Sequence, residues 1–142
     1  MMRAWALLHL VSASAWAGCV MTELVAEKWL LQPGDRARLA GLHWQIDRWV
    51  ELPLAALALL AGVRAWPGAA ADAGLRAMAA AGGVAMLANA VCSVWVWRRW
   101  QAARLGDPAA HAHADRWQHR WGALVALGLG LALGAAAWRA TA

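Results

Sequence analysis

The chain alternates between four long apolar blocks and three short polar breaks. The blocks are rich in Ala, Leu and Val and lack the narrow apolar stripe of a helix on the surface of a soluble protein. Each block can supply the ~20 residues that an α-helix needs to cross the hydrocarbon core of a bilayer. This pattern predicts an all-α integral membrane protein.

The three polar breaks set the ends of the expected helices. Each break contains an aspartate that can cap the helix that follows; these are Asp35, Asp72 and Asp107. The expected helices span residues 3–31, 36–66, 73–104 and 108–139. Because short loops force neighbouring helices to run antiparallel, we expect a single domain, residues 1–142, forming an up-down-up-down four-helix transmembrane bundle.

The chain has a net charge of +5, and its basic residues lie at the ends of the blocks. The sides of the first and third breaks hold most of them: Lys28, Arg36, Arg38, Arg48, Arg98, Arg99, Arg104, Arg116 and Arg120. The other side holds Arg3, Arg64, Arg76 and Arg139. This arrangement argues against nucleic-acid binding. It predicts a multi-pass protein of a bacterial inner membrane with the richer side in the cytoplasm and both termini outside.

Several glycines offer places where helices could approach one another closely. Gly130 and Gly134 form a small-xxx-small pair, and Gly82 and Gly83 are adjacent in the third block. Small residues of this kind are enriched where membrane helices touch. We therefore expect helix contacts at these four glycines, either inside the bundle or in a homodimer or larger membrane complex.

Ionisable residues enter three of the four blocks from the arginine-rich side. They recur at i, i+4 spacing, with Glu23 and Glu27 in the first block, His43, Asp47 and Glu51 in the second, and His111, Asp115 and His119 in the fourth. This spacing places each set on one face of its helix. Counted inward from the outer arginine of each helix, Glu23, His43 and His119 reach the same level to within about one turn.

Imidazoles and carboxylates from facing helices are the groups with which helical bundles build metal sites. Such mixed ligands suit a transition metal ion, with iron, copper and zinc all open. The expected ligands are Glu23, His43, Asp47, Asp115 and His119, supported by Glu27, Glu51 and His111. The sequence thus predicts a site at the cytoplasmic end of the bundle, for metal handling or membrane redox chemistry.

Two other interpretations remain open at this stage. The first is a b-type haem protein in which His43 and His119 are the axial ligands. The second is a non-catalytic accessory subunit of a larger membrane complex. There the carboxylates would be neutralised by arginines, namely Arg48, Arg98, Arg99, Arg116 and Arg120. Whether the protein is an enzyme is left open by all three interpretations.

The segment LHLVSASAWAGCV, residues 8–20, resembles the first helix of a group of small four-helix membrane proteins. The group includes the CopD-like copper-resistance membrane domains and the HemJ type of bacterial protoporphyrinogen oxidase. The shared residues are His9, Trp16 and Gly18, and ELPLAALALLAGVRAW, residues 51–66, is similar to the second helix of the group. The resemblance implies a copper- or haem-related role for His9, whereas position alone predicts a hydrogen bond from His9 to a neighbouring helix.

Overall fold

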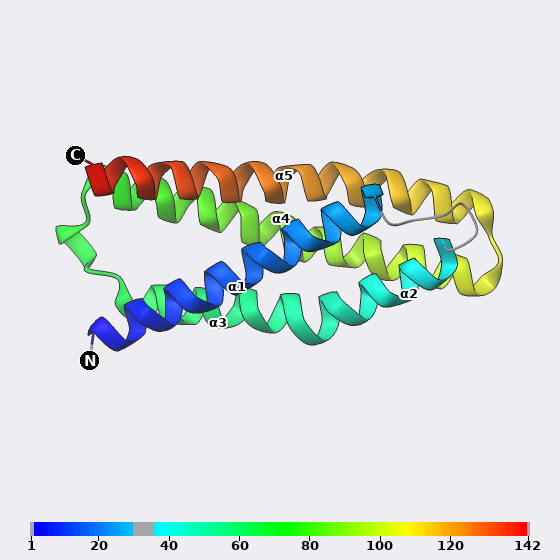
Figure 1. Ribbon diagram of the computed structural model, residues 1–142, viewed down its shortest axis with the longest axis horizontal. Helices are drawn as coiled ribbons and strands as arrows, with labels where there is room; N and C mark the ends of the chain where they lie inside the picture. The colour runs from blue at the N-terminus through cyan, green and yellow to red at the C-terminus, as the bar shows by residue number, and fades with distance from the viewer. Residues whose placement is uncertain (1, 30–35, 142) are drawn as a thin grey trace.

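The computed structural model describes residues 2–29 and 36–141, and nearly all of these residues are helical (Figure 1). The long helices are α1 (Met2–Trp29), α2 (Arg36–Ile46), α3 (Leu52–Ala65), α4 (Ala73–Leu105) and α5 (Pro108–Thr141). A π-helical turn, η1 (Asp47–Glu51), joins α2 to α3, and a short 3-10 helix, η2 (Gly68–Ala70), precedes α4. The described residues contain no strand, so the predicted all-α class is confirmed.

The helix caps predicted around α4 and α5 are also confirmed. The carboxylate of Asp72 accepts a hydrogen bond from the backbone N–H of Leu75 at 2.7 Å, which satisfies an unpaired donor at the start of α4. After Leu105, the last residue of α4, Gly106 caps the helix with a φ of 68°, a left-handed conformation that favours glycine. Asp107 Oδ1 accepts from the backbone N–H groups of Ala109 and Ala110 at 3.0 and 2.9 Å. The third predicted cap, Asp35, lies outside the described residues.

Residues 36–66 were expected to form one α-helix, and the structure instead divides this helix at η1. The backbone N–H of Leu52 donates to the carbonyl of Asp47, five residues back, which is the hydrogen bond of a π-turn. Pro53 gives the physical reason. Proline within a helix lacks an N–H, and its ring clashes with the carbonyl four residues earlier, here that of Trp49. A wider turn just before Pro53 relieves that clash.

Among the described residues, three helices are long and apolar enough to cross a membrane: Arg3–Glu27 within α1, α4, and Pro108–Arg139 within α5. The prediction of four spans is therefore supported for three of them. The remaining helical rod, residues 36–65, has the length for a fourth span, but η1 interrupts it and α3 alone has 14 residues. These long apolar helices indicate association with a lipid bilayer.

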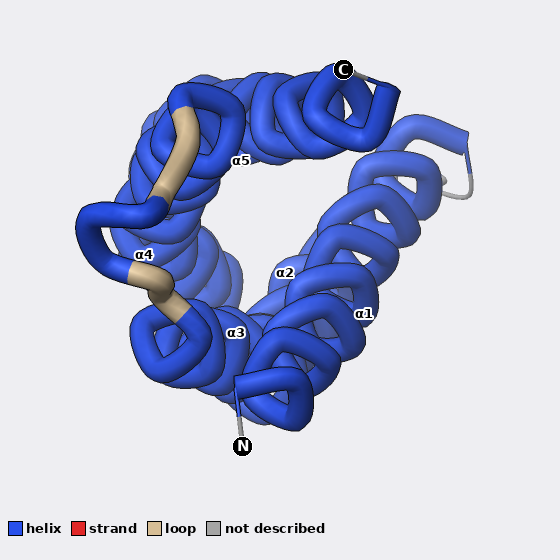
Figure 2. The backbone as a smooth tube through the Cα atoms, turned by 90° about the vertical axis from the view of Figure 1, so that its left-hand side faces the viewer, coloured by secondary structure: helices blue, strands red, loops and turns tan. Residues whose placement is uncertain are grey.

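The helices form two pairs that meet most closely at one end. α4 and α5 pack side by side along their length, and α3 packs against α1. α1 runs diagonally and has few contacts with α5, while α2 provides the main contact between the pairs by packing on α4 (Figures 1 and 2). Both termini lie at the end opposite the α4–α5 connection (Figure 1).

The apolar core is built mainly from small side chains. Its buried members are Trp16, Val20, Ala55, Ala85, Ala88 and Val125. α5 approaches α4 closely at Gly128, where an added Cβ would lie 2.9 Å from Ala85 Cβ and 3.0 Å from the Ala81 carbonyl oxygen of α4. The sequence prediction of close contacts at other glycines was wrong within this chain. An added Cβ would meet nothing within 4 Å at any of them, namely Gly82, Gly83, Gly130 and Gly134.

His9 joins α1 to α3 near the termini. Its Nδ1 lies 2.7 Å from the carbonyl oxygen of Ala58, which confirms the predicted hydrogen bond to a neighbouring helix. Gly62 makes room for the imidazole, because a Cβ at this position would lie 2.9 Å from the same nitrogen. His9 therefore has a structural role in α1–α3 packing, in the half of the bundle away from His43 and His119.

A buried His/carboxylate site between α1 and α2

His43 lies at the centre of the polar residues near the end of α1. The residue is 8% exposed, and both of its ring nitrogens face carboxylates of α1. Nε2 lies 2.8 Å from Glu23 Oε2, and Nδ1 lies 3.1 Å from Glu27 Oε1. The i, i+4 spacing of the two glutamates places them one turn apart on α1, so that together they bracket one imidazole.

Arg99 of α4 closes the site on the side of Glu27. It is 3% exposed, and its Nη1 donates to Glu27 Oε1 and to Asp115 Oδ1, each at 2.8 Å. Gln118 of α5 adds a hydrogen bond from Nε2 to Glu27 Oε1 at 3.2 Å. The Glu27 carboxylate thus receives donors from three helices, and its negative charge is compensated by Arg99.

The surroundings of Nδ1 bear on which His43 nitrogen carries the proton. Arg99 Nη2, Gln118 Nε2 and Glu27 Oε1 lie 3.3, 3.2 and 3.1 Å from it, and only the glutamate oxygen of these three can accept a hydrogen bond. With Nδ1–H donated to Glu27, Nε2 faces Glu23, and a proton on Nε2 would complete the ion pair with that carboxylate. A metal ion bound at Nε2 would take the place of this proton. A carboxylate that orients an imidazole in this way is the usual second layer of a histidine–metal bond.

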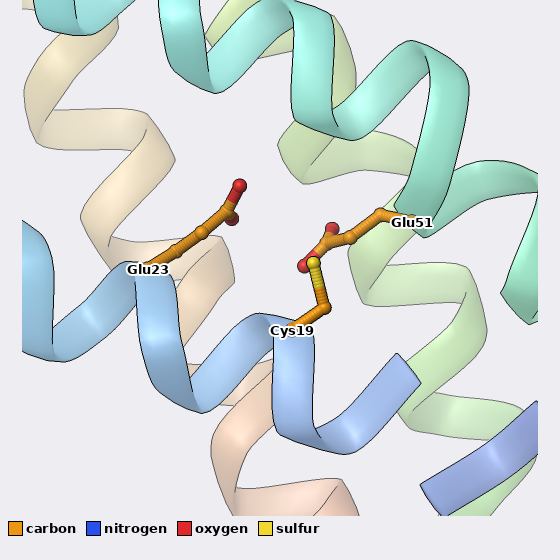
Figure 3. A group of neighbouring side chains, drawn as sticks. All are labelled: Cys19, Glu23 and Glu51. Carbon is orange, nitrogen blue, oxygen red and sulfur yellow. The ribbon is translucent and has the colours of Figure 1, made fainter. Parts of the chain in front are cut away.

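Three more residues extend the site deeper into the bundle. Asp47 and Glu51 of η1 are 2% and 3% exposed, and Cys19 lies one turn before Glu23 on α1. Two sets of ligand atoms result, each with all atoms within 4.8 Å of one another: Glu23, His43 and Asp47, and Cys19, Glu23 and Glu51. Figure 3 shows the second set, with the Cys19 thiol directed at the Glu51 carboxylate. Glu23 belongs to both.

Two carboxylate oxygens in these sets are buried without a hydrogen-bond partner, Glu23 Oε1 and Asp47 Oδ2. The same residues line a cavity of about 60 Å³, together with Glu27, His43 and Glu51. An unsatisfied buried polar group costs about 1–3 kcal/mol, and more when it is charged. Both oxygens therefore call for a positively charged or hydrogen-bonding occupant of the cavity.

None of the described arginine side chains provides that charge. Their ion pairs with carboxylates are Arg99–Glu27, Arg99–Asp115 and Arg139–Asp72. Three of the arginines expected to neutralise the site lie instead over indole rings, Arg48 over Trp49, Arg98 over Trp95 and Arg120 over Trp117. Among the described side chains, Glu23 forms its ion pair with His43, whereas Asp47 and Glu51 form none.

The predicted ligands from α5 lie further out. Asp115 is bound by Arg99, and the half-exposed His119 places Nε2 3.6 Å from Glu27 Oε2. Together with His111 they line an open cavity of about 810 Å³ at the α4–α5 connection. The structure thus brings Glu23, His43 and Asp47 together in one compact set of ligand atoms, to which Asp115 and His119 do not belong.

The haem arrangement has little room in this geometry. His43 and His119 both line the 60 Å³ cavity, which is far smaller than the ~300–1,000 Å³ of ordinary cofactor pockets. The larger cavity is lined by His111 and His119 but not by His43.

The π-turn helps to place the ligands of the second rod on one face. On a regular α-helix, each i, i+4 step rotates about 40° beyond a full turn, so His43 and Glu51 would differ by about 80°. The wider turn at η1 has more residues per turn and counteracts this drift. Such turns are frequent at functional sites.

Sequence reasoning missed the roles of Gln118, Cys19 and the π-turn. Gln118 is next to His119 and three residues after Asp115, a spacing that places it on the inward face of α5. Pro53 inside a predicted helix was the available signal for the irregular turn.

Comparison with known proteins adds no relative: no family model matches the sequence, and neither the curated proteins nor the solved structures give a significant match.

Proposed function

We propose that this protein is a multi-pass membrane protein that binds a transition metal ion through Glu23, His43 and Asp47. Its helices would run up-down-up-down across the bilayer, with the arginine-rich end and the metal site toward the cytoplasm and both termini outside. The role would be metal handling or redox chemistry in the membrane.

The observation that carries the proposal is the pair of buried carboxylate oxygens, Glu23 Oε1 and Asp47 Oδ2, which have no partner beside the Nε2 edge of His43. Ionisable groups at membrane depth are costly unless they find a partner. A divalent cation would satisfy both oxygens at once. Binding would replace the 2.8 Å contact between His43 Nε2 and Glu23 by two bonds to the ion, with His43 held by Glu27.

Three protein ligands leave positions open on the ion. Metal sites with three protein ligands and an open position are typical of catalysis and exchange, whereas structural zinc sites are closed by four. The open cavity lined by Asp115, His119 and His111 lies on the outer side of Glu27, where it would give the ion a hydrated approach from the cytoplasm.

The test is the metal content of the detergent-purified protein, measured by element-resolved mass spectrometry after preparation without chelators. We expect near-stoichiometric or greater iron, copper or zinc in the wild type, and loss of the His43-dependent ion in His43→Ala. His113→Ala is the matched control, because His113 is exposed and packs edge-on against Trp95, outside both ligand sets.

Helix content by circular dichroism must stay unchanged in both variants, so that loss of metal is separated from loss of fold. A wild-type protein without any metal, before and after incubation with each of the three ions, would overturn the proposal. A partner for the two buried carboxylate oxygens would then be sought in a second subunit.

A further inference from the structure

We propose that the site holds two metal ions bridged by the carboxylate of Glu23. One ion would be bound by Glu23, His43 and Asp47, and the second by Cys19, Glu23 and Glu51. This inference rests on the proposed metal-binding function and extends it from a mononuclear to a dinuclear site.

The geometry of Glu23 suits a bridge. Its carboxylate is the one group common to the two ligand sets. Oε2 lies 2.8 Å from His43 Nε2, in the first set, while Oε1 is buried and has no partner. A carboxylate can bind a different cation through each oxygen, and ions in two-metal sites lie about 3.5–4 Å apart.

Each ligand set is also compact enough to close on an ion. Metal–ligand bonds of ~2.0–2.3 Å place the donors around one ion at most ~4.6 Å apart. The ligand atoms of each set already lie within 4.8 Å of one another, so small side-chain movements suffice. Asp47, which is 2% exposed and has an unpartnered Oδ2, and Glu51, which is 3% exposed, are held beside the same small cavity.

The charges of the two ligand sets would match two divalent ions. A thiol that binds a metal loses its proton. With both ions bound, Glu23, Asp47, Glu51 and a thiolate at Cys19 would supply four negative charges, while Glu27 is paired with Arg99. Two divalent ions would balance these charges, and charged groups at membrane depth need such partners.

Cys92 provides an internal comparison. It lines the same cavity from α4, but its Sγ donates to the carbonyl oxygen of Gln118 at 3.5 Å and it belongs to neither ligand set. The inference therefore assigns different roles to the two cysteines, Cys19 as a ligand and Cys92 as a neighbour.

Cobalt(II) is a suitable probe, because a thiolate bound to it gives a charge-transfer absorption in the near ultraviolet. The metal-free full-length protein in detergent is dialysed against Co²⁺, and bound cobalt per chain and the absorption spectrum are both recorded. The variants are Cys19→Ala, Glu51→Gln and, as the matched control, Cys92→Ala. Circular dichroism checks that each keeps its helix content.

We expect two cobalt ions per chain and the thiolate absorption in the wild type and in Cys92→Ala. Cys19→Ala should bind one ion and lose the absorption, and Glu51→Gln should bind one ion as well. One ion per chain without thiolate absorption in the wild type, or an absorption lost in Cys92→Ala instead, would overturn the dinuclear site and leave the mononuclear proposal standing. No bound cobalt would overturn both.

Discussion

The two halves of the bundle bring their helices together in opposite ways. Toward the termini, contacts are made by alanines and a glycine, with Ala58 and Ala85 fully buried and Gly128 against α4. Toward the α4–α5 connection, long polar side chains bridge the helices, among them His43, Glu27 and Arg99. One half is held by backbone proximity and the other by charge.

The difference between these two kinds of packing indicates which half could bind a ligand. Helices that pack through small residues need no bound ligand, because their close approach already gives complete van der Waals contact. The polar half is incomplete, since it contains buried carboxylate oxygens without partners. Selection for stability alone favours the first kind of packing, so the second kind indicates a function.

The largest effect is expected from the charge that holds the polar half together. Arg99→Met leaves Glu27 without its arginine and releases Asp115, and removal of one partner from a buried ion pair costs about 3–5 kcal/mol. We expect a marked drop in the midpoint of thermal unfolding, followed by circular dichroism in detergent.

Arg98→Met is the control for this variant. Arg98 is exposed and lies over the Trp95 ring at 4.7 Å, an interaction worth about 0.5–1 kcal/mol at exposed sites. Equal losses in the two variants would contradict the view that one buried arginine organises this half.

An intermediate effect is expected in the apolar half. Gly128→Ala places a Cβ 2.9 Å from Ala85 Cβ and 3.0 Å from the Ala81 carbonyl oxygen, so α4 and α5 must move apart. Overpacking of this kind costs about 1–3 kcal/mol. The same thermal unfolding experiment measures it.

Gly130→Ala, two residues further along α5, is the matched control. An added Cβ there meets nothing within 4 Å, so the higher helix propensity of alanine should leave stability equal or raise it by up to about 1 kcal/mol. A loss of stability in Gly130→Ala would reveal a contact with a second copy of the chain.

The smallest effect is expected at Asp72, the exposed cap at the start of α4, which also pairs with Arg139 near the end of α5. The Arg139 guanidinium at 2.7 Å, with the backbone N–H of Leu75, holds the pKa of Asp72 below its ordinary value. Its contribution to stability is therefore present above the ordinary aspartate pKa of ~3.9 and is lost as the pH falls through the lowered value. Asp72→Asn should unfold slightly earlier than the wild type at neutral pH, and the two unfolding curves should converge in acid.

The helix limits could be predicted from sequence because their determinants are local. Asp72 and Asp107 cap the helices that follow them, and these signals are contained within four residues. That Glu23 and His43 lie at the same depth along the bundle was also predictable, because each helical residue adds a fixed rise along the helix axis.

The partners of individual side chains were less predictable, because they depend on helix rotation and on the crossing of α1 over the bundle. Five arginines lie at the same end of the expected helices as the carboxylates, but helix orientation buries Arg99 and leaves Arg48, Arg98 and Arg120 on indole rings. For the same reason, Gly128 rather than Gly130 faces α4.

The π-helical turn at Asp47–Glu51 sets the rotation of α3 about its axis relative to α2, and so connects the polar half to the apolar half. Deletion of one residue within it would turn α3 by about 100° relative to α2, since each residue of an α-helix contributes that angle. Ala58 could then no longer receive His9 while His43 stayed between the glutamates of α1. The length of this turn therefore couples the His9–Ala58 contact in the apolar half to the position of His43 in the polar half.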